Sequence, residues 1–169
     1  EAQDAIADLE IADERIDLLS IEDQTERMAF ALNAPAQGFD MAEMKKLLAD
    51  VKDAKRLSLT FRFVSGTNDL DAQSKLDILR LADLIQSPEI AGKQVMLLGF
   101  TDVDGRFSTN ESVSARRAGQ VRTAVIAASD NKIPQSAIVA KGYGPLAPVA
   151  CDDATSRGQL NRRVEVWVK

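Results

Sequence analysis

An apolar strand that leads into a long helix places the strongest constraint on how this chain of 169 residues folds. The segment from Gln94 to Phe100 is apolar on both faces, which is typical of a central strand in a sheet. A helix is predicted to begin near Asn110. Asp102 and the N-terminus of this helix should then face one crevice, at the kind of place where α/β folds bind ligands.

One arginine falls on the apolar face of the predicted helix. At 100° per residue Arg117 lies within that face, whereas Arg116 and Arg122 point elsewhere. A buried guanidinium keeps its proton and needs an anionic partner. Asp102 is the nearest candidate in the sequence, so the alternatives are a structural salt bridge between Arg117 and Asp102 or a ligand site. The apolar positions are Val113, Val121, Ala124, Val125 and Ala128.

The remaining segments predict an α+β, α/β-like fold in the order βαβαββ. Two right-handed crossovers should make the first strands parallel, and the last pair should add antiparallel character. The result is a mixed four-stranded sheet with helices on one face, plus accessory helices at the N-terminus. In the last strand Val164, Val166 and Val168 should point inward, and Glu165 and Trp167 outward. The other expected elements are strands at 57–63 and around 138–141, and a helix at 71–86 that Pro88 terminates.

Charge divides the chain near residue 56. Residues 1–56 hold 14 acidic and 7 basic side chains, net −7, whereas residues 57–169 hold 12 and 14, net +2. We therefore expect an accessory helical segment at 1–56 and a folded domain at 57–169. The accessory segment contains a short extended piece at 16–21 and a helix that starts at Asp40, with an apolar stripe that must be covered by the domain, by an upstream domain or by a second copy in a homodimer. The stripe consists of Met41, Met44, Leu47, Leu48 and Val51.

Composition excludes several classes of function. The chain has no histidine, which removes Ser-His-Asp and Cys-His nucleophile chemistry and the usual zinc ligand sets. Cys151 is the single cysteine and cannot form a disulfide within the chain. The acidic balance argues against nucleic acid, and no apolar run is long enough to be a transmembrane segment. The run from Asp102 to Gly105 imitates the start of a calcium loop but lacks the later ligands, so no metal or cofactor is expected.

A longer pattern resembles a known family. The pattern T-D-x-x-G, then Asn, then V-S-x-x-R-A-x-x-V, with N-R-R-V-E far downstream, resembles the OmpA-like peptidoglycan-binding domain over residues 57–169. A weaker likeness, in the run EDQTERMAFAL, is to the tail of a periplasmic substrate-binding domain. The positions that carry the main resemblance are Thr101, Asp102, Gly105, Asn110, Val113, Ser114, Arg117, Ala118, Val121, Asn161, Arg162, Arg163, Val164 and Glu165.

The resemblance implies a non-catalytic peptidoglycan binder in the periplasm of a Gram-negative cell envelope. Asp102 and Arg117 would hold the diaminopimelate residue of the stem peptide, anchoring the protein to the cell wall. Asp102 suits the ligand's ammonium, and Arg117 its carboxylate. Thr101, Gly105, Asn110 and Arg162 complete the expected binding site. We interpret Arg163 as a surface or ion-pair group.

Two rival interpretations remain open. In the first, Asp102 and Asp104 act as an acid and base pair of an enzyme, although the sequence offers no nucleophile or metal ligand nearby. In the second, the chain is a protein–protein interaction scaffold of the envelope, whose acidic N-terminal helices bind a partner while the crevice is unused.

Overall fold

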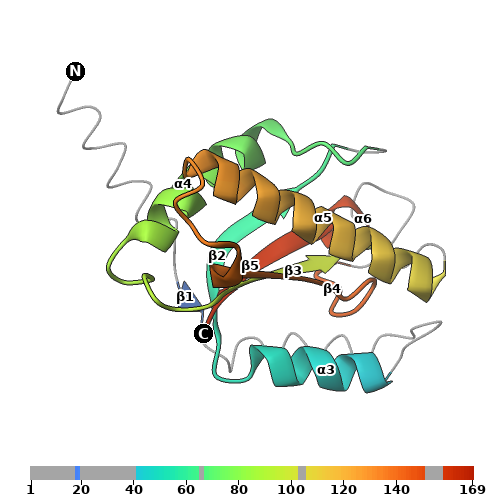
Figure 1. The fold of residues 1–169 in the computed structure, drawn as a ribbon. Helices are drawn as coiled ribbons and strands as arrows, with labels where there is room; N and C mark the ends of the chain where they lie inside the picture. The colour runs from blue at the N-terminus through green and yellow to red at the C-terminus, as the bar shows by residue number, and fades with distance from the viewer. Residues whose placement is uncertain (1–17, 20–40, 65–66, 103–105, 151–157) are drawn as a thin grey trace.

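One mixed sheet organises the chain, in the strand order β1-β2-β5-β3-β4 (Figure 1). The structure, a computed structural model, describes residues 18–19, 41–64, 67–102, 106–150 and 158–169. The strands are β1 (Leu18–Leu19), β2 (Lys55–Arg62), β3 (Val95–Phe100), β4 (Ile138–Gly142) and β5 (Arg163–Val168). The helices are α3 (Met41–Val51), α4 (Ala72–Gln86), α5 (Phe107–Ala128), α6 (Gly158–Asn161) and the short 3-10 helix η1 (Gln135–Ala137).

The predicted mixed sheet is confirmed. β3 and β4 are parallel, with Val95 opposite Ile138 and Gly99 opposite Gly142. β5 is antiparallel to both β2 and β3 and lies between them. The short β1, within the predicted extended piece, pairs with the other edge of β2.

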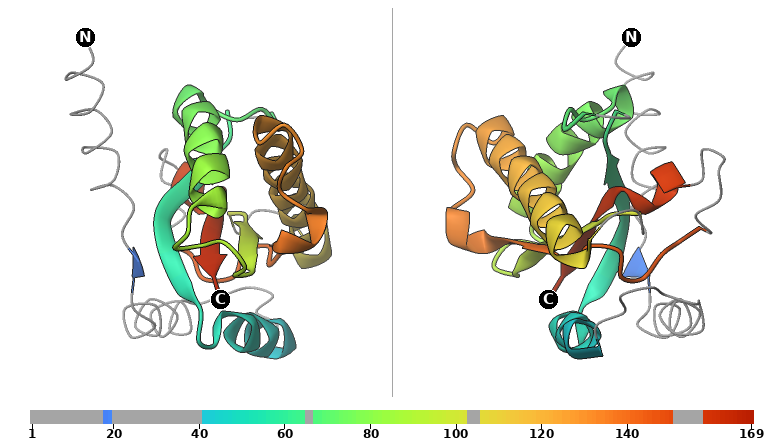
Figure 2. Two further views of the ribbon diagram at one scale, coloured as in Figure 1. Left: turned by 60° about the vertical axis from the view of Figure 1, so that its left-hand side comes forward. Right: turned by 90° about the vertical axis from the view of Figure 1, so that its right-hand side faces the viewer.

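The helices α4 and α5 cover one face of the sheet (Figures 1 and 2). Asp71 caps α4, since its side chain accepts a hydrogen bond from the backbone N–H of Ser74 at 2.7 Å. The helix ends at Gln86, and Ser87 caps it before Pro88, so the predicted end at residue 86 is confirmed. Its buried apolar positions pack with the alternate residues of β2 and β5. These helix residues are Ile78, Leu81, Ala82 and Ile85.

The opposite face of the sheet is covered by α3, which lies below the strands in Figure 1, and a second core fills the space between them. Met44, Leu47 and Val51 of α3 are buried there against Met96, Leu98, Phe100 and Trp167. The predicted alternation of β5 is correct, since Val164, Val166 and Val168 belong to the first core. The expectation that Trp167 faces outward to solvent is wrong, because α3 covers it and leaves it 2% exposed.

Glu165 is also buried rather than outward, because its carboxylate pairs with the side chains of Arg163 and Arg56. It accepts a hydrogen bond from Arg163 Nε at 2.7 Å and one from Trp167 Nε1 at 3.1 Å. Arg56 Nε lies 3.6 Å from Glu165 Oε2, the oxygen that also accepts the hydrogen bond from Trp167. Arg163 is 3% exposed and its guanidinium lies 4.3 Å from the ring centroid of Phe100. Arg163 is therefore the ion-pair group that the sequence favoured, but not a surface one.

The helix α3 ties part of the acidic segment to the sheet. Its stripe is only partly covered, since Met41 is 55% and Leu48 41% exposed. The boundary near residue 56 stays a prediction; β2 begins at Lys55, and the helix α3 before it packs on the second core. Within the described part of the chain, no helix is long and apolar enough to cross a membrane.

Candidate functional site

The carboxyl end of β3 and the first half of α5 lie side by side, where the sequence predicts a crevice. The helix can approach the sheet closely here because β3 and β4 carry glycines at paired positions. A Cβ on Gly99 would overlap the carbonyl oxygen of Ser114, and one on Gly142 would lie 2.6 Å from the carbonyl oxygen of Glu111. These glycines therefore let the backbone of α5 lie directly on the ends of β3 and β4, and Thr101 and Asp102 follow the end of β3.

Asp102 is held by Arg162, which the sequence places 60 residues away. Arg162 Nη1 donates to Asp102 Oδ2 at 2.5 Å, and both side chains are partly buried. The main chain of Asp102 is also fixed, since its carbonyl oxygen accepts a hydrogen bond from Thr101 Oγ1 at 2.9 Å. A carboxylate has about four acceptor positions, so one arginine does not saturate it.

Arg117 lies inward, as predicted, and is 9% exposed. Its guanidinium lies 5.0 Å from the centroid of the Phe63 ring, and Nη2 lies 3.5 Å from the carbonyl oxygen of Thr67. Among the described residues, Nε has no hydrogen-bond partner and no ion pair joins Arg117 to Asp102. The structural salt bridge considered from the sequence is thus replaced by the pair of Asp102 with Arg162.

The site carries an excess of positive charge. Burial lowers the pKa of Arg117, and the neighbouring Arg162 lowers it further, whereas Asp102 acts in the opposite direction. Arginine nevertheless stays protonated in proteins. Two guanidinium groups therefore lie near one carboxylate that pairs with Arg162, and an anionic group of a ligand would stabilise Arg117.

Asn110 lies in the site, but not as the start of the helix. The helix α5 begins at Phe107, and the backbone N–H of Asn110 already donates to the carbonyl oxygen of Arg106 at 3.0 Å. The first-turn amides that a ligand could use therefore belong to residues 107–109. The side chain of Asn110 lies 3.4 Å from the carbonyl oxygen of Asp102 and is buried.

Several sequence candidates lie outside the described residues. Gly105, Asp104 and Cys151 are among them, so the structure does not test their roles. In the described ranges, no group of three acidic, histidine or cysteine side chains is arranged to hold a metal ion. Phe63 and Thr67 were missed from the sequence, because a ring and a backbone carbonyl that meet Arg117 across 50 or more residues leave no local pattern.

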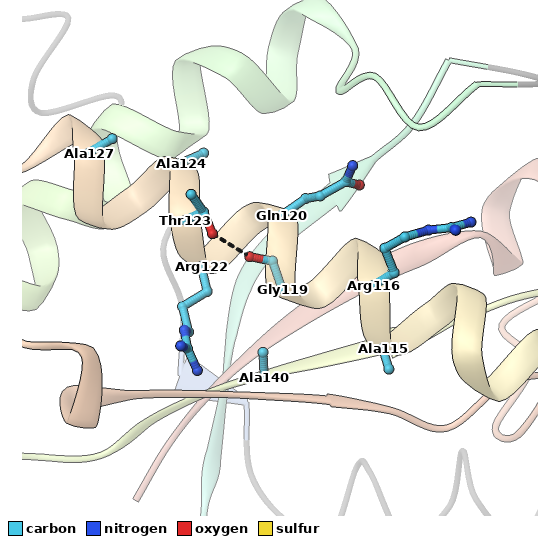
Figure 3. Close-up of a pocket in the computed structure, with 9 residues that line it drawn as sticks. All are labelled: Ala115, Arg116, Gly119, Gln120, Arg122, Thr123, Ala124, Ala127 and Ala140. Atoms are coloured by element: carbon cyan, nitrogen blue, oxygen red, sulfur yellow. Dashed lines mark hydrogen bonds between the residues drawn. The ribbon is translucent and has the colours of Figure 1, made fainter.

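A shallow groove of about 690 Å³ follows the outer face of α5 beside β4 (Figure 3). Arg116 and Arg122 lie at this groove, which confirms that they point away from the crevice. Small residues line the groove, and Thr123 Oγ1 donates to the carbonyl oxygen of Gly119 at 3.0 Å (Figure 3). The helix therefore presents Arg117 and Arg116 to different surroundings, although they are adjacent in sequence.

Comparisons with known proteins agree with this architecture. Residues 62–162 match the OmpA family. Outer membrane porin F of Pseudomonas aeruginosa is 32% identical over 120 residues, which cover 70% of this chain and 33% of that porin. The chain thus spans about a third of the length of this relative.

Solved structures of other proteins have a similar fold, and two of them illustrate it. The peptidoglycan-associated lipoprotein of Burkholderia pseudomallei aligns with a TM-score of 0.57 and 19% identity, over 65% of this chain and 89% of that one. The C-terminal domain of Helicobacter pylori MotB aligns with a TM-score of 0.56 and 25% identity, over 66% and 84%. The family match supports the prediction that the domain is not an enzyme.

Proposed function

The chain belongs to the OmpA family, and from this premise we propose that it binds cell-wall peptidoglycan without catalysis and anchors an envelope protein to the wall. The observation that carries the proposal is Arg117, a nearly buried cation whose Nε has no partner in the described part of the chain. One of the similar structures is named a peptidoglycan-associated lipoprotein, which supports the same ligand. The location that follows is the periplasmic side of a Gram-negative envelope.

The ligand group that fits this crevice best is the free end of diaminopimelate. That end carries an ammonium and a carboxylate on one carbon. Arg117 would grip the carboxylate, and Asp102 would accept hydrogen bonds from the ammonium. Arg162 would orient the carboxylate of Asp102 through the 2.5 Å contact. Thr101, Asn110 and Gly105 would shape the backbone around the two charged groups.

The affinity of a single site should be weak. Each charge-assisted contact contributes about 1.5 to 3 kcal/mol before the cost of ordering the partners. Peptidoglycan repeats the stem peptide many times, so several tethered copies of this domain would bind far more tightly than one.

Co-sedimentation with insoluble peptidoglycan tests the proposal. We expect the wild-type chain to sediment with the wall and Asp102→Ala and Arg117→Ala to remain in the supernatant with their fold intact. Arg116→Ala is the matched control, because Arg116 is exposed on the outer face of the same helix and should not affect sedimentation. If the Asp102 and Arg117 variants still sediment, the site is wrong.

A second measurement tests the ligand group itself. Stem tetrapeptides that contain either diaminopimelate or lysine differ only in the carboxylate at the end of the diaminopimelate side chain, which lysine lacks. We expect the diaminopimelate form to bind about 10-fold to 100-fold more tightly, as expected for one lost charged contact. Equal affinity for both peptides would remove Arg117 from the proposed role. Absence of binding to either the peptides or the wall would favour an interaction scaffold.

A further inference from the structure

A buried tyrosine links α3 to the turn after β4. The hydroxyl of Tyr143 donates to Asp50 Oδ2 in α3, and Lys141 Nζ donates to the same oxygen at 2.6 Å. Tyr143 is 3% exposed, and its ring stacks on Phe100 with centroids 6.1 Å apart. Asp50 is therefore the polar contact that fixes α3 against the turn after β4.

The same turn holds the strand end that precedes Asp102. The backbone N–H of Tyr143 donates to the carbonyl oxygen of Gly99 at 2.9 Å. The carbonyl oxygen of Gly144 then accepts a hydrogen bond from the N–H of Thr101 at 2.7 Å. These two bonds continue the pairing of β3 beyond its last strand residue, so the position of Asp102 depends on the turn.

The turn also contacts α5. The N–H of Gly144 donates to Ser114 Oγ at 2.9 Å, one helical turn before Arg117. Gly144 has φ of 55°, in the left-handed region that glycine adopts without strain. One short segment therefore fixes both the strand that carries Asp102 and the helix that carries Arg117.

We propose that Asp50 and Tyr143 are positioning residues for ligand binding, which couple the docking of α3 to the geometry of the crevice. The inference rests on the proposed function, since it concerns the affinity of that same site. Binding sites need their groups within about 0.5 Å of the productive geometry. If the turn lost its contact with α3, the hydrogen bond from Thr101 to Gly144 would hold the end of β3 less firmly, and the distance between Asp102 and Arg117 would change.

Two isosteric variants test the coupling. Tyr143→Phe keeps the ring and removes the hydroxyl, and Asp50→Asn keeps the shape and removes the charge. We expect each to lower the affinity for the diaminopimelate tetrapeptide about 3-fold to 10-fold and to shift the NMR amide signals of Thr101 and Asp102. Asp50→Glu, which keeps the carboxylate, should recover part of the affinity.

The control separates positioning from general stability. Ile85→Ala opens a cavity in the core beneath α4, close to Gln94, which precedes the first residue of β3 and lies at the end of the strand away from Asp102. It should lower the melting temperature at least as much as the two variants and leave the affinity unchanged. Wild-type affinity in both Tyr143→Phe and Asp50→Asn, or an equal loss in Ile85→Ala, would overturn the inference alone. A wild-type chain that does not bind the tetrapeptide would overturn the proposed function and this inference with it.

Discussion

Alanine substitutions at three glycines should have opposite effects on stability, because only two of them lie under the backbone of α5. A Cβ on Gly99 or Gly142 would overlap main-chain atoms of the helix, at Ser114 or Ala115, which cannot rotate away as a side chain would. A Cβ on Gly119, within the helix itself, would meet nothing within 4 Å. The same chemical change therefore tests the close approach of helix and sheet.

The expected magnitudes follow from these contacts. Overpacking of this kind costs about 3 kcal/mol. For a chain of this length 1 kcal/mol shifts the melting temperature by about 2 to 4 °C, so Gly99→Ala and Gly142→Ala should melt roughly 6 to 12 °C lower. Gly119→Ala should gain about 0.5 to 1 kcal/mol, because glycine is a poor helix former, and should melt roughly 1 to 4 °C higher.

Thermal unfolding followed by circular dichroism measures these shifts, and tetrapeptide affinity adds a second readout. Displacement of α5 at Gly99 should also weaken binding, because Arg117 lies one turn beyond Ser114. Gly119→Ala should bind as the wild type does. If both Gly99→Ala and Gly142→Ala melted at the wild-type temperature, the close contact between the backbone of α5 and the ends of β3 and β4 would be refuted.

Three further predictions concern the removal of α3, the dependence of stability on pH, and the dependence of ligand affinity on pH and salt. The free energy of unfolding of a fragment of residues 57–169 should be roughly 5 to 8 kcal/mol lower than that of a fragment of residues 41–169, because the shorter fragment lacks the buried Met44, Leu47 and Val51. Equal midpoints of urea unfolding for the two fragments would contradict this. The pKa of Asp50 lies below its usual 3.8, since hydrogen bonds from Lys141 and Tyr143 outweigh the effect of burial, so its contribution to stability should be present above about pH 4 and be lost as the pH falls further. Burial and the contact with Asp50 raise the pKa of Tyr143 above its usual 10, so its contribution should be present below pH 10 and be lost at higher pH, and a pH series of urea unfolding should show a plateau between the two limits. Ligand affinity should show no transition near pH 6 to 7, since the chain has no histidine, and should fall only modestly between low and high salt; calorimetry from pH 4 to 9, at low and at high salt, checks both.

The sequence by itself determined the elements with strong local signals. The helical period of α4, its cap at Asp71 and its stop before Pro88 depend on neighbours a few residues apart. The alternation in β2 and β5 and the inward direction of Arg117 follow from periodicity in the same way. These features depend on contacts within one or two turns, which a sequence displays directly.

Only the tertiary structure decided which distant residues meet. The insertion of β5 between β2 and β3 brings Arg162 to Asp102, and α3 buries Trp167 although its strand position points away from the first core. Phe63 and Thr67, which lie between β2 and α4, contact Arg117, and Tyr143 contacts Asp50, which is 93 residues away in the sequence. Local periodicity gives the direction of a side chain relative to its own element, but its partner is set by how the elements pack, and that packing depends on the whole chain.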